Sequence, residues 1–336
     1  MPSSATTSTR SKLLPFDLRS LHFKGILQYF MIEFQDPTPS DRCWATALAT
    51  LEGTPLCDYS FPVLFCWQQT YGFQIARLDR RMLVRLESSR GPAYLWPVGD
   101  GDPTPALEAL TREAHSQGHP LRLICLGQYH KNWLADRYPG RFSFAEVRDS
   151  FDYLYSVDRL ADLPGKKLHA KRNHIHRLDD HCPGWTWAPL TEEDIPDCLA
   201  MSEAWYQEAR LRDTPDALST LEDEHRALCL AMEYRRPLGL EGVVLRWQGE
   251  VFAFALGAPL TDTVFDVHFE RARNDIQGAY PAVNRSFAQY VRNRYPRIRY
   301  LNREDDMGIE GLRKAKMSYY PDYLQVNFCA VETEAV

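Results

Sequence analysis

The pattern of apolar and polar positions predicts alternating strands and helices from residue 94 onwards. Leu107, Leu110 and Ala114 recur at helical spacing, between a start at Thr104–Pro105 and a glycine stop at Gly118. Apolar runs bounded by turn residues predict strands on both sides of this helix. The other expected elements of this half are strands at 94–98, at 121–126 and within 141–157, and a short helix through Trp133 and Leu134 that ends at Tyr138–Pro139.

The second half repeats this order of elements. A helix from Pro281 carries Val283, Phe287 and Val291 on one face. The remaining expected elements are strands at 243–256, 264–270, 298–301 and 323–331, and a helix at 309–319 that ends at Tyr320–Pro321. Helix, strand, helix, Tyr–Pro and strand therefore occur twice in the same order, which predicts a duplicated α/β unit.

These elements suggest a division of the chain into two domains. We expect a disordered leader at 1–14, a first domain at 15–180 that ends in a basic inter-domain helix at 165–179, and a second domain at 185–336. The boundary is placed between Asp179 and Pro189, where Pro183–Gly184 interrupts the pattern.

Composition restricts the possible partners and the cell compartment. The formal net charge is -6, so any nucleic-acid contact must come from a local basic patch, and attraction to a membrane by overall charge is disfavoured. The 8 cysteines form no CxxC pair, which indicates reduced thiols. Without a signal peptide or a run of about 18 apolar residues, we expect a cytoplasmic protein with no transmembrane segment.

The basic segment at 165–178 is a candidate phosphate-binding helix. Leu168, Ile175 and Leu178 share one helical side, and Lys171 and Arg172 flank that apolar stripe. A solvated basic face is the alternative. The segment and its surroundings also carry four histidines, but their spacing fits no standard zinc pattern, so no metal site is predicted: His169, His174, His176 and His181.

The strand at 264–270 carries three titratable groups at alternate positions. Strand periodicity places Asp266, His268 and Glu270 on one face, opposite three apolar side chains. Such a strand could border a wet cleft and supply a general base. The alternative is the solvent-facing side of an antiparallel sheet.

Two turns between a strand and a helix are further candidates. The acids at 302–308 could belong to a binding loop or could favour the start of the following helix. The turn at 275–284 could hold phosphate or carboxylate on backbone N–H groups, with Gly278 permitting a close approach.

Several of these segments together resemble the family of proteins related to the C-terminal, catalytic domain of phosphatidylglycerol lysyltransferases. The resemblance covers most of the chain and is carried by the segments 95–102, 148–155, 165–175, 275–280 and 302–316. It implies an α/β (α+β) fold of two tandem GNAT-like domains, each a mixed, largely antiparallel sheet flanked by helices. It also implies kinship with enzymes that move an amino acid from aminoacyl-tRNA onto an amine or hydroxyl acceptor.

This sequence departs from the pattern of that family in two ways. The membrane enzymes carry a multi-span N-terminal module that this sequence lacks, which counts against a lipid acceptor. The GNAT pyrophosphate signature is not matched at 277–282, which counts against an acyl-CoA donor.

We therefore expect an aminoacyltransferase that uses charged tRNA as co-substrate, needs no other cofactor, and acts on a small-molecule or lipid-headgroup acceptor. An acyl-CoA-dependent N-acyltransferase and a non-catalytic binding module remain alternatives. The candidate catalytic residues are Asp266, His268, Glu270 and Asp305. The candidate substrate-binding residues are Lys167, Lys171, Arg172, Asn173, Gln277, Tyr280, Asn302, Arg303, Glu304 and Lys314.

Overall fold

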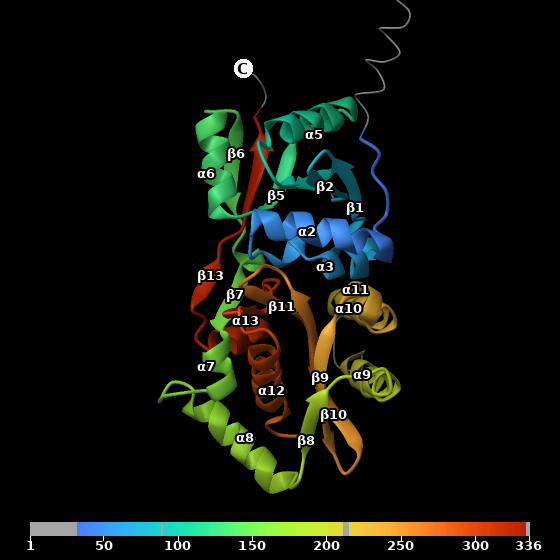
Figure 1. Ribbon diagram of the computed structural model, residues 1–336, viewed down its shortest axis with the longest axis vertical. Coiled ribbons are helices and arrows are strands. Elements are labelled where there is room, and N and C mark those ends of the chain that lie inside the picture. The colour runs from blue at the N-terminus through green and yellow to red at the C-terminus, as the bar shows by residue number, and fades with distance from the viewer. Residues whose placement is uncertain (1–31, 89, 211–214, 334–336) are drawn as a thin grey trace, which may run out of the picture.

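The computed structural model describes residues 32–88, 90–210 and 215–333, and it shows two sheets placed end to end (Figure 1). The expected leader at 1–14 lies outside the described residues. The first sheet has the order β1-β2-β3-β5-β14-β6, with β4 paired to β2. Its strands are β1 (Gln74–Leu78), β2 (Arg81–Leu86), β3 (Ala93–Leu95), β4 (Val98–Gly99), β5 (Arg122–Leu126), β6 (Phe142–Glu146) and β14 (Phe328–Glu332).

The second sheet has the order β13-β7-β12-β11-β10-β9-β8. Both sheets are mostly antiparallel and contain one parallel pair each, β3 with β5 and β11 with β12. The strands of the second sheet are β7 (Asp152–Ser156), β8 (Thr186–Pro189), β9 (Glu241–Trp247), β10 (Glu250–Pro259), β11 (Val264–Ala272), β12 (Tyr300–Asn302) and β13 (Tyr323–Gln325).

Helices cover both sheets and fill the junction between them. The helices of the first unit are α2 (Arg42–Glu52), α3 (Phe61–Cys66), α4 (Gln68–Tyr71), α5 (Thr104–Ser116) and α6 (Gln128–Arg137). Those of the second unit are α7 (Val157–Asp162), α8 (His169–His181), α9 (Ile195–Arg210), α10 (Pro215–Glu233), α11 (Arg235–Leu238), α12 (Ala279–Arg294) and α13 (Glu310–Met317). Short 3-10 turns lie at η1 (Pro39–Asp41), η2 (Cys57–Tyr59) and η3 (Arg148–Ser150). In Figure 1, α2 and α3 lie where the two units meet.

The predicted fold class, two tandem GNAT-like units of mixed, largely antiparallel sheet flanked by helices, is confirmed. The predicted repeat is also present, since α5-β5-α6-β6 and α12-β12-α13-β13 follow one another in the same order. Local signals account for the start and end of these helices. At the start of α5, for example, the Asp102 carboxylate accepts hydrogen bonds from the backbone N–H and the hydroxyl of Thr104.

The strand connections differ from the sequence expectation. The segment expected as strand at 141–157 contributes β6 to the first sheet and β7 to the second, and the one at 323–331 contributes β13 to the second and β14 to the first. Strand β7 lies between β12 and β13, and β14 lies between β5 and β6, so each sheet receives a strand from the other half of the repeat. The chain thus first enters the second sheet at Asp152, before the expected boundary between Asp179 and Pro189.

Apolar side chains form two large cores on opposite faces of the second sheet. One core contains Phe265 and Val267 of β11 with Phe287 of α12 and the apolar side of α8. The other joins the interior of the first unit to α9 and α10, and it contains Phe269 of β11. None of the helices in the described ranges is both long and apolar enough to cross a membrane.

Candidate active site

The two units are joined by hydrogen bonds between buried polar groups. The Asp152 carboxylate accepts from the backbone N–H of Cys57 at 2.8 Å and from the Asn302 amide at 2.7 Å. The same amide also donates to the Pro55 carbonyl oxygen at 2.8 Å. Asn302, expected to bind substrate, is fully buried. Its two hydrogen bonds hold the end of β12 against the first unit.

A β-bulge divides the three titratable residues of β11. Val267 pairs with Gly257 and Phe269 pairs with Leu256, so His268 is one extra residue opposite β10. The bulge reverses the alternation of side chains beyond it. The expectation that Asp266, His268 and Glu270 share one face is therefore wrong, because Glu270 lies on the α12 side of the sheet and the other two lie on the side of the first unit.

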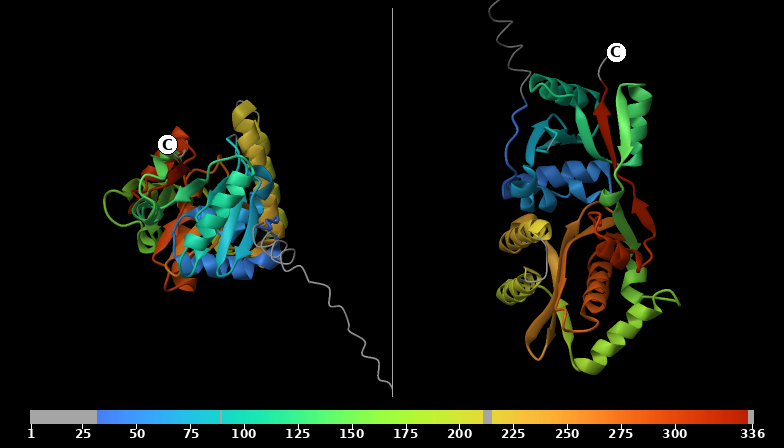
Figure 2. Two further views of the ribbon diagram at one scale, coloured as in Figure 1. Left: turned by 90° about the horizontal axis from the view of Figure 1, so that it is seen from above. Right: turned by 180° about the vertical axis from the view of Figure 1, so that it is seen from behind.

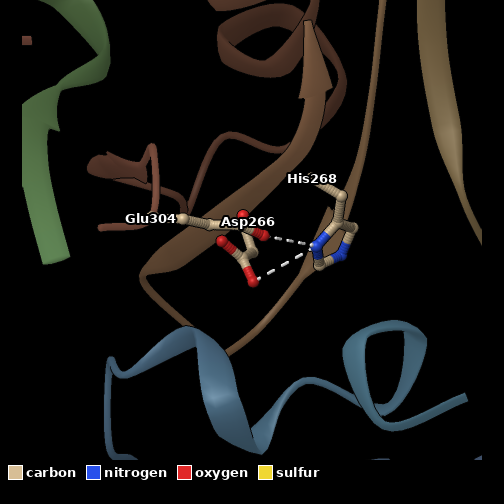
Figure 3. A group of neighbouring side chains, drawn as sticks. All are labelled: Asp266, His268 and Glu304. Carbon is tan, nitrogen blue, oxygen red and sulfur yellow. Dashed lines mark hydrogen bonds and ion pairs between the residues drawn. The ribbon is translucent and has the colours of Figure 1, made fainter. Parts of the chain in front are cut away.

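His268 connects a carboxylate pair to a hydroxyl group of the first unit. Its Nδ1 lies 3.1 Å from Glu304 Oε1 and 3.5 Å from Asp266 Oδ2 (Figure 3). Its Nε2 lies 3.3 Å from the hydroxyl oxygen of Ser60, the residue that precedes α3. The imidazole is 3% exposed. A hydrogen bond from Nδ1–H to Glu304 would leave Nε2 as a proton acceptor directed at Ser60.

Carboxylates crowd this imidazole. We define the acidic cluster as Asp58, Asp152, Asp266, Glu304 and Asp305. Burial, together with repulsion from the other carboxylates of the cluster, raises the pKa of Asp58 to about 6 and the pKa values of Asp152 and Asp305 to about 7. The same causes raise the pKa of the fully buried Asp266 well above its usual value. The cluster thus gathers several acids that titrate near neutral pH.

Lys316 supplies positive charge at the acidic cluster. Its ammonium group donates to the backbone carbonyl oxygens of Arg303 and Asp305. Burial is the main cause that lowers its pKa. Glu304, Asp305 and Asp152 lie near enough to its ammonium group to raise the Lys316 pKa, so Lys316 offsets part of the negative charge that the cluster carries when its acids are ionised.

Cationic groups gather on the opposite side of β11. Arg303 Nη2 lies 3.0 Å from Glu270 Oε1, and the guanidinium stands over the ring of Tyr319. The Lys171 ammonium lies 4.0 Å from the centre of the same ring and donates to the Ser318 hydroxyl at 2.7 Å. Burial and the charge of Arg303 lower the pKa of Lys171 to about 8. We call Lys171, Arg303 and Tyr319 the cationic patch.

The segment directly after β12 supplies residues to both the acidic cluster and the cationic patch. Glu304 has φ +55°, a left-handed conformation that a non-glycine side chain rarely adopts. Arg303 points toward Glu270 and Glu304 points toward His268, as the alternation of side chains along paired, extended chain requires. Consecutive residues thus reach opposite sides of the sheet.

Several sequence-predicted residues lie away from these two groups. Arg172, at the edge of the apolar stripe as expected, donates to the carbonyl oxygens of Leu163 and Gly165. Its guanidinium is therefore engaged in holding the turn before α8. Tyr280, in the first turn of α12, is half-buried, with Glu270 and Arg271 near enough to influence its pKa. Four further candidates are exposed: Lys167, Asn173, Gln277 and Lys314.

The start of α12 packs against another helix. Gly278 has φ +89°, and a Cβ atom there would lie 2.2 Å from the His174 carbonyl oxygen of α8. Gly278 thus permits the close approach of two helices. A backbone carbonyl occupies the space in which an anion would approach this turn.

The sequence analysis overlooked four residues of the site, namely Ser60, Asp58, Asp152 and Lys316. Lys316 follows Leu312 by one helical turn and precedes Tyr319, so the helical spacing of α13 already placed it on the buried side. Lys314, which was chosen instead, lies on the exposed side. Ser60 and Asp58 lie in a segment without clear periodicity.

Fold and site together define an α/β protein of two tandem GNAT-like units with an acid–imidazole centre at their junction. A family model described as phosphatidylglycerol lysyltransferase, C-terminal, matches residues 53–331. The chain belongs to this family. No curated protein sequence matches it significantly.

Solved structures agree with this assignment. A conserved protein of unknown function from Bacteroides thetaiotaomicron shares 35% identity, with 90% of this chain and 100% of that chain covered and a TM-score of 0.84. The C-terminal domain of a putative lysylphosphatidylglycerol synthetase from Agrobacterium fabrum shares 15% identity over 88% and 93% of the two chains, with a TM-score of 0.62. L-PGS from Bacillus licheniformis shares 13% identity over 80% and 91%, with a TM-score of 0.57. These last two show the same fold.

Proposed function

We propose that this protein is an aminoacyltransferase that moves an aminoacyl group from charged tRNA onto an amine or hydroxyl acceptor. The observation that carries the proposal is the His268 imidazole, held between the Glu304 and Asp266 carboxylates at Nδ1 and directed at a hydroxyl group at Nε2. A carboxylate that fixes an imidazole in this way prepares the other ring nitrogen to accept a proton. The family name, which refers to lysyl transfer, favours this chemistry.

His268 is the general base of the proposed reaction. The ester that joins an amino acid to tRNA is already activated, so the protein needs to orient the acceptor and remove its proton. Ser60 Oγ occupies the position from which an acceptor hydroxyl or amine would give its proton to Nε2. The acceptor then attacks the ester carbonyl, and the tRNA 3′ oxygen leaves with the proton from the imidazolium.

The charges on the two sides of β11 fit the two ends of such a donor. The acidic cluster on one side attracts an ammonium group, whether it belongs to the aminoacyl group or to an amine acceptor. The cationic patch on the other side suits the phosphates of the tRNA 3′ end. We therefore assign aminoacyl and acceptor binding to the first side and the tRNA backbone to the second.

The packing at Gly278 counts against the acyl-CoA alternative. An acyl-CoA donor would need exposed backbone N–H groups at a helix start for its pyrophosphate. At α12 the His174 carbonyl oxygen and the Leu178 side chain lie against this position.

Single-turnover transfer from a panel of charged tRNAs tests the proposal. Wild-type protein should transfer one amino acid to a panel of amine and hydroxyl acceptors, and His268→Gln should lower the rate by about 100-fold or more. His119→Gln is the control, because His119 lies beside Gly91 in the first unit. Its rate should match that of the wild type.

Three results would overturn the proposal. They are no binding of any charged tRNA at low salt, an unchanged rate in a folded His268→Gln variant, and transfer from acetyl-CoA but not from tRNA. Transfer from acetyl-CoA but not from tRNA would establish the acyl-CoA alternative. A protein that binds no charged tRNA and transfers no group would favour a binding module.

A further inference from the structure

The three side chains around His268 Nδ1 have the composition of a metal site. Asp266 and His268 come from β11, and Glu304 comes from the chain just after β12 (Figure 3). One ligand atom from each, namely two carboxylate oxygens and a ring nitrogen, lies within 4.8 Å of the others. Among the described residues, this is the group of His, Cys, Asp and Glu that meets this spacing.

The distances suit simultaneous coordination of one ion. Zinc lies about 2.0–2.2 Å from nitrogen and oxygen ligands, so two ligands at a tetrahedral angle are about 3.4 Å apart. Nδ1 lies 3.1 Å from Glu304 Oε1 and 3.5 Å from Asp266 Oδ2. Three protein ligands also leave a fourth position open.

Asp266 gives an independent reason to expect a cation. Its side chain is fully buried, yet neither carboxylate oxygen has a hydrogen-bond partner in the part of the chain that the structure describes. Buried carboxylate oxygens are ordinarily satisfied, because a buried polar group without a partner has lost its hydration with nothing in return. One of these oxygens lies within 4.8 Å of a ligand atom of both His268 and Glu304.

The surrounding charge leads to the same expectation. The acidic cluster has five carboxylates, and the ammonium of Lys316 is directed at the backbone carbonyls of Arg303 and Asp305. A divalent cation would offset two of the remaining negative charges without moving any element of the fold.

The Ser60 hydroxyl lies at the ring nitrogen of His268 that would not bind the metal. A histidine that binds a metal through one ring nitrogen usually donates the other N–H to a nearby oxygen, which fixes the tautomer. His268 Nε2 lies 3.3 Å from Ser60 Oγ, which can accept such a bond. Glu304, whose side chain is 26% exposed, is the most exposed of the three ligands. The ion would therefore enter from its side.

The geometry points to a binding site for one divalent transition-metal ion of the zinc class at Asp266, His268 and Glu304. The ion takes the Nδ1 lone pair, so the ring proton resides on Nε2 and is donated to Ser60. If His268 is the base of the proposed transfer, the ion and catalysis exclude each other, and zinc inhibits the reaction. Binding itself requires no catalytic activity.

Equilibrium dialysis against Zn²⁺ and Co²⁺ at about pH 7.5, followed by metal analysis, tests the site, since its ligands must be deprotonated to bind. The full chain should bind one ion, and bound Co²⁺ should show the visible absorption of nitrogen and oxygen coordination. Asp266→Asn and Glu304→Gln should each weaken binding by about tenfold or more. Glu270→Gln is the matched control, because this carboxylate is on the same strand but pairs with Arg303 on the other face. It should leave metal affinity unchanged.

Wild-type protein that binds no stoichiometric ion would overturn the inference, and this measurement does not depend on any variant folding. An ion that binds equally well to folded Asp266→Asn and Glu304→Gln variants would lie elsewhere and would also overturn it. A protein that binds one ion, yet in its metal-free form transfers nothing from charged tRNA, would instead contradict the proposed function alone.

Discussion

At the scale of single residues, small backbone irregularities decide which charges meet. The one extra residue at His268 turns Glu270 to the face opposite Asp266, where it pairs with Arg303. The result is an acidic group and a cationic group on either side of a single strand. In a regular strand, Glu270 would instead share the face of Asp266 and His268, away from Arg303.

Lys171 should make donor binding depend on pH. Because its pKa is lowered to about 8, Lys171 is charged below that pH and becomes neutral as the pH rises through it. Under the proposed function, affinity for an amide-linked aminoacyl-RNA mimic should therefore fall by about tenfold between pH 7 and pH 9, the loss of one charge-assisted contact. Fluorescence anisotropy at constant salt measures this.

Lys171→Arg provides the comparison, because a guanidinium stays charged throughout this range. Its affinity should fall less over this range than that of the wild type. A wild-type affinity that does not change with pH would contradict the role assigned to Lys171.

At the scale of elements, α8 is held firmly against the second unit. Leu168, Ile175 and Leu178 are buried in the core that α12 and β11 share, and Lys171 reaches Ser318 after α13. The helix therefore positions one cation of the cationic patch, while His169, His176 and Arg177 are exposed. The alternative of a solvated basic face is thus partly correct, whereas phosphate binding by this segment stays a prediction.

Gly278→Ala should destabilise the packing of α8 on α12. The new methyl group would lie 2.2 Å from the His174 carbonyl oxygen, and the backbone would keep φ +89°. We expect a loss of about 2 kcal/mol or more in the free energy of unfolding, measured by chemical denaturation.

Gly184→Ala separates the clash from the backbone strain. Gly184 has φ +78°, but a Cβ atom there would have nothing within 4 Å. This variant should lose only about 1 kcal/mol. Equal losses of unfolding free energy in both variants would show that the close contact of α8 and α12 at Gly278 adds nothing to stability.

At the scale of the whole molecule, the two units depend on each other through exchanged strands. Strand β14, at the end of the described chain, lies inside the first sheet, and β7 lies inside the second. Figure 2 shows the chain leaving the second unit after β13 and running as β14 along the first unit. Strand exchange and the buried bonds of Asp152 and Asn302 hold the site residues of both units in one arrangement.

Removal of β14 should therefore unfold the first unit, although the deletion lies in the last part of the chain. Truncation after Gln325 leaves β5 and β6 without the strand between them, and it removes Phe328, whose burial alone is worth about 1.5–3 kcal/mol. Hydrogen exchange should show loss of protection in β5 and β6.

Truncation after Thr333, which keeps β14, is the control and should preserve that protection. A shorter chain that retains protected β5 and β6 strands would contradict the structural role given to β14.

The sequence by itself determined the order of elements, the repeat and the apolar faces of the helices, because these follow from local periodicity and from turn residues. Strand periodicity also singled out Asp266 and His268, and the family resemblance singled out Glu304. Tertiary structure alone decided that β7 and β14 change sheets, that a bulge removes Glu270 from the group, and that Ser60, Asp58 and Asp152 join it. These features depend on hydrogen bonds between segments far apart in the chain, and such pairing leaves no periodic signal in either segment.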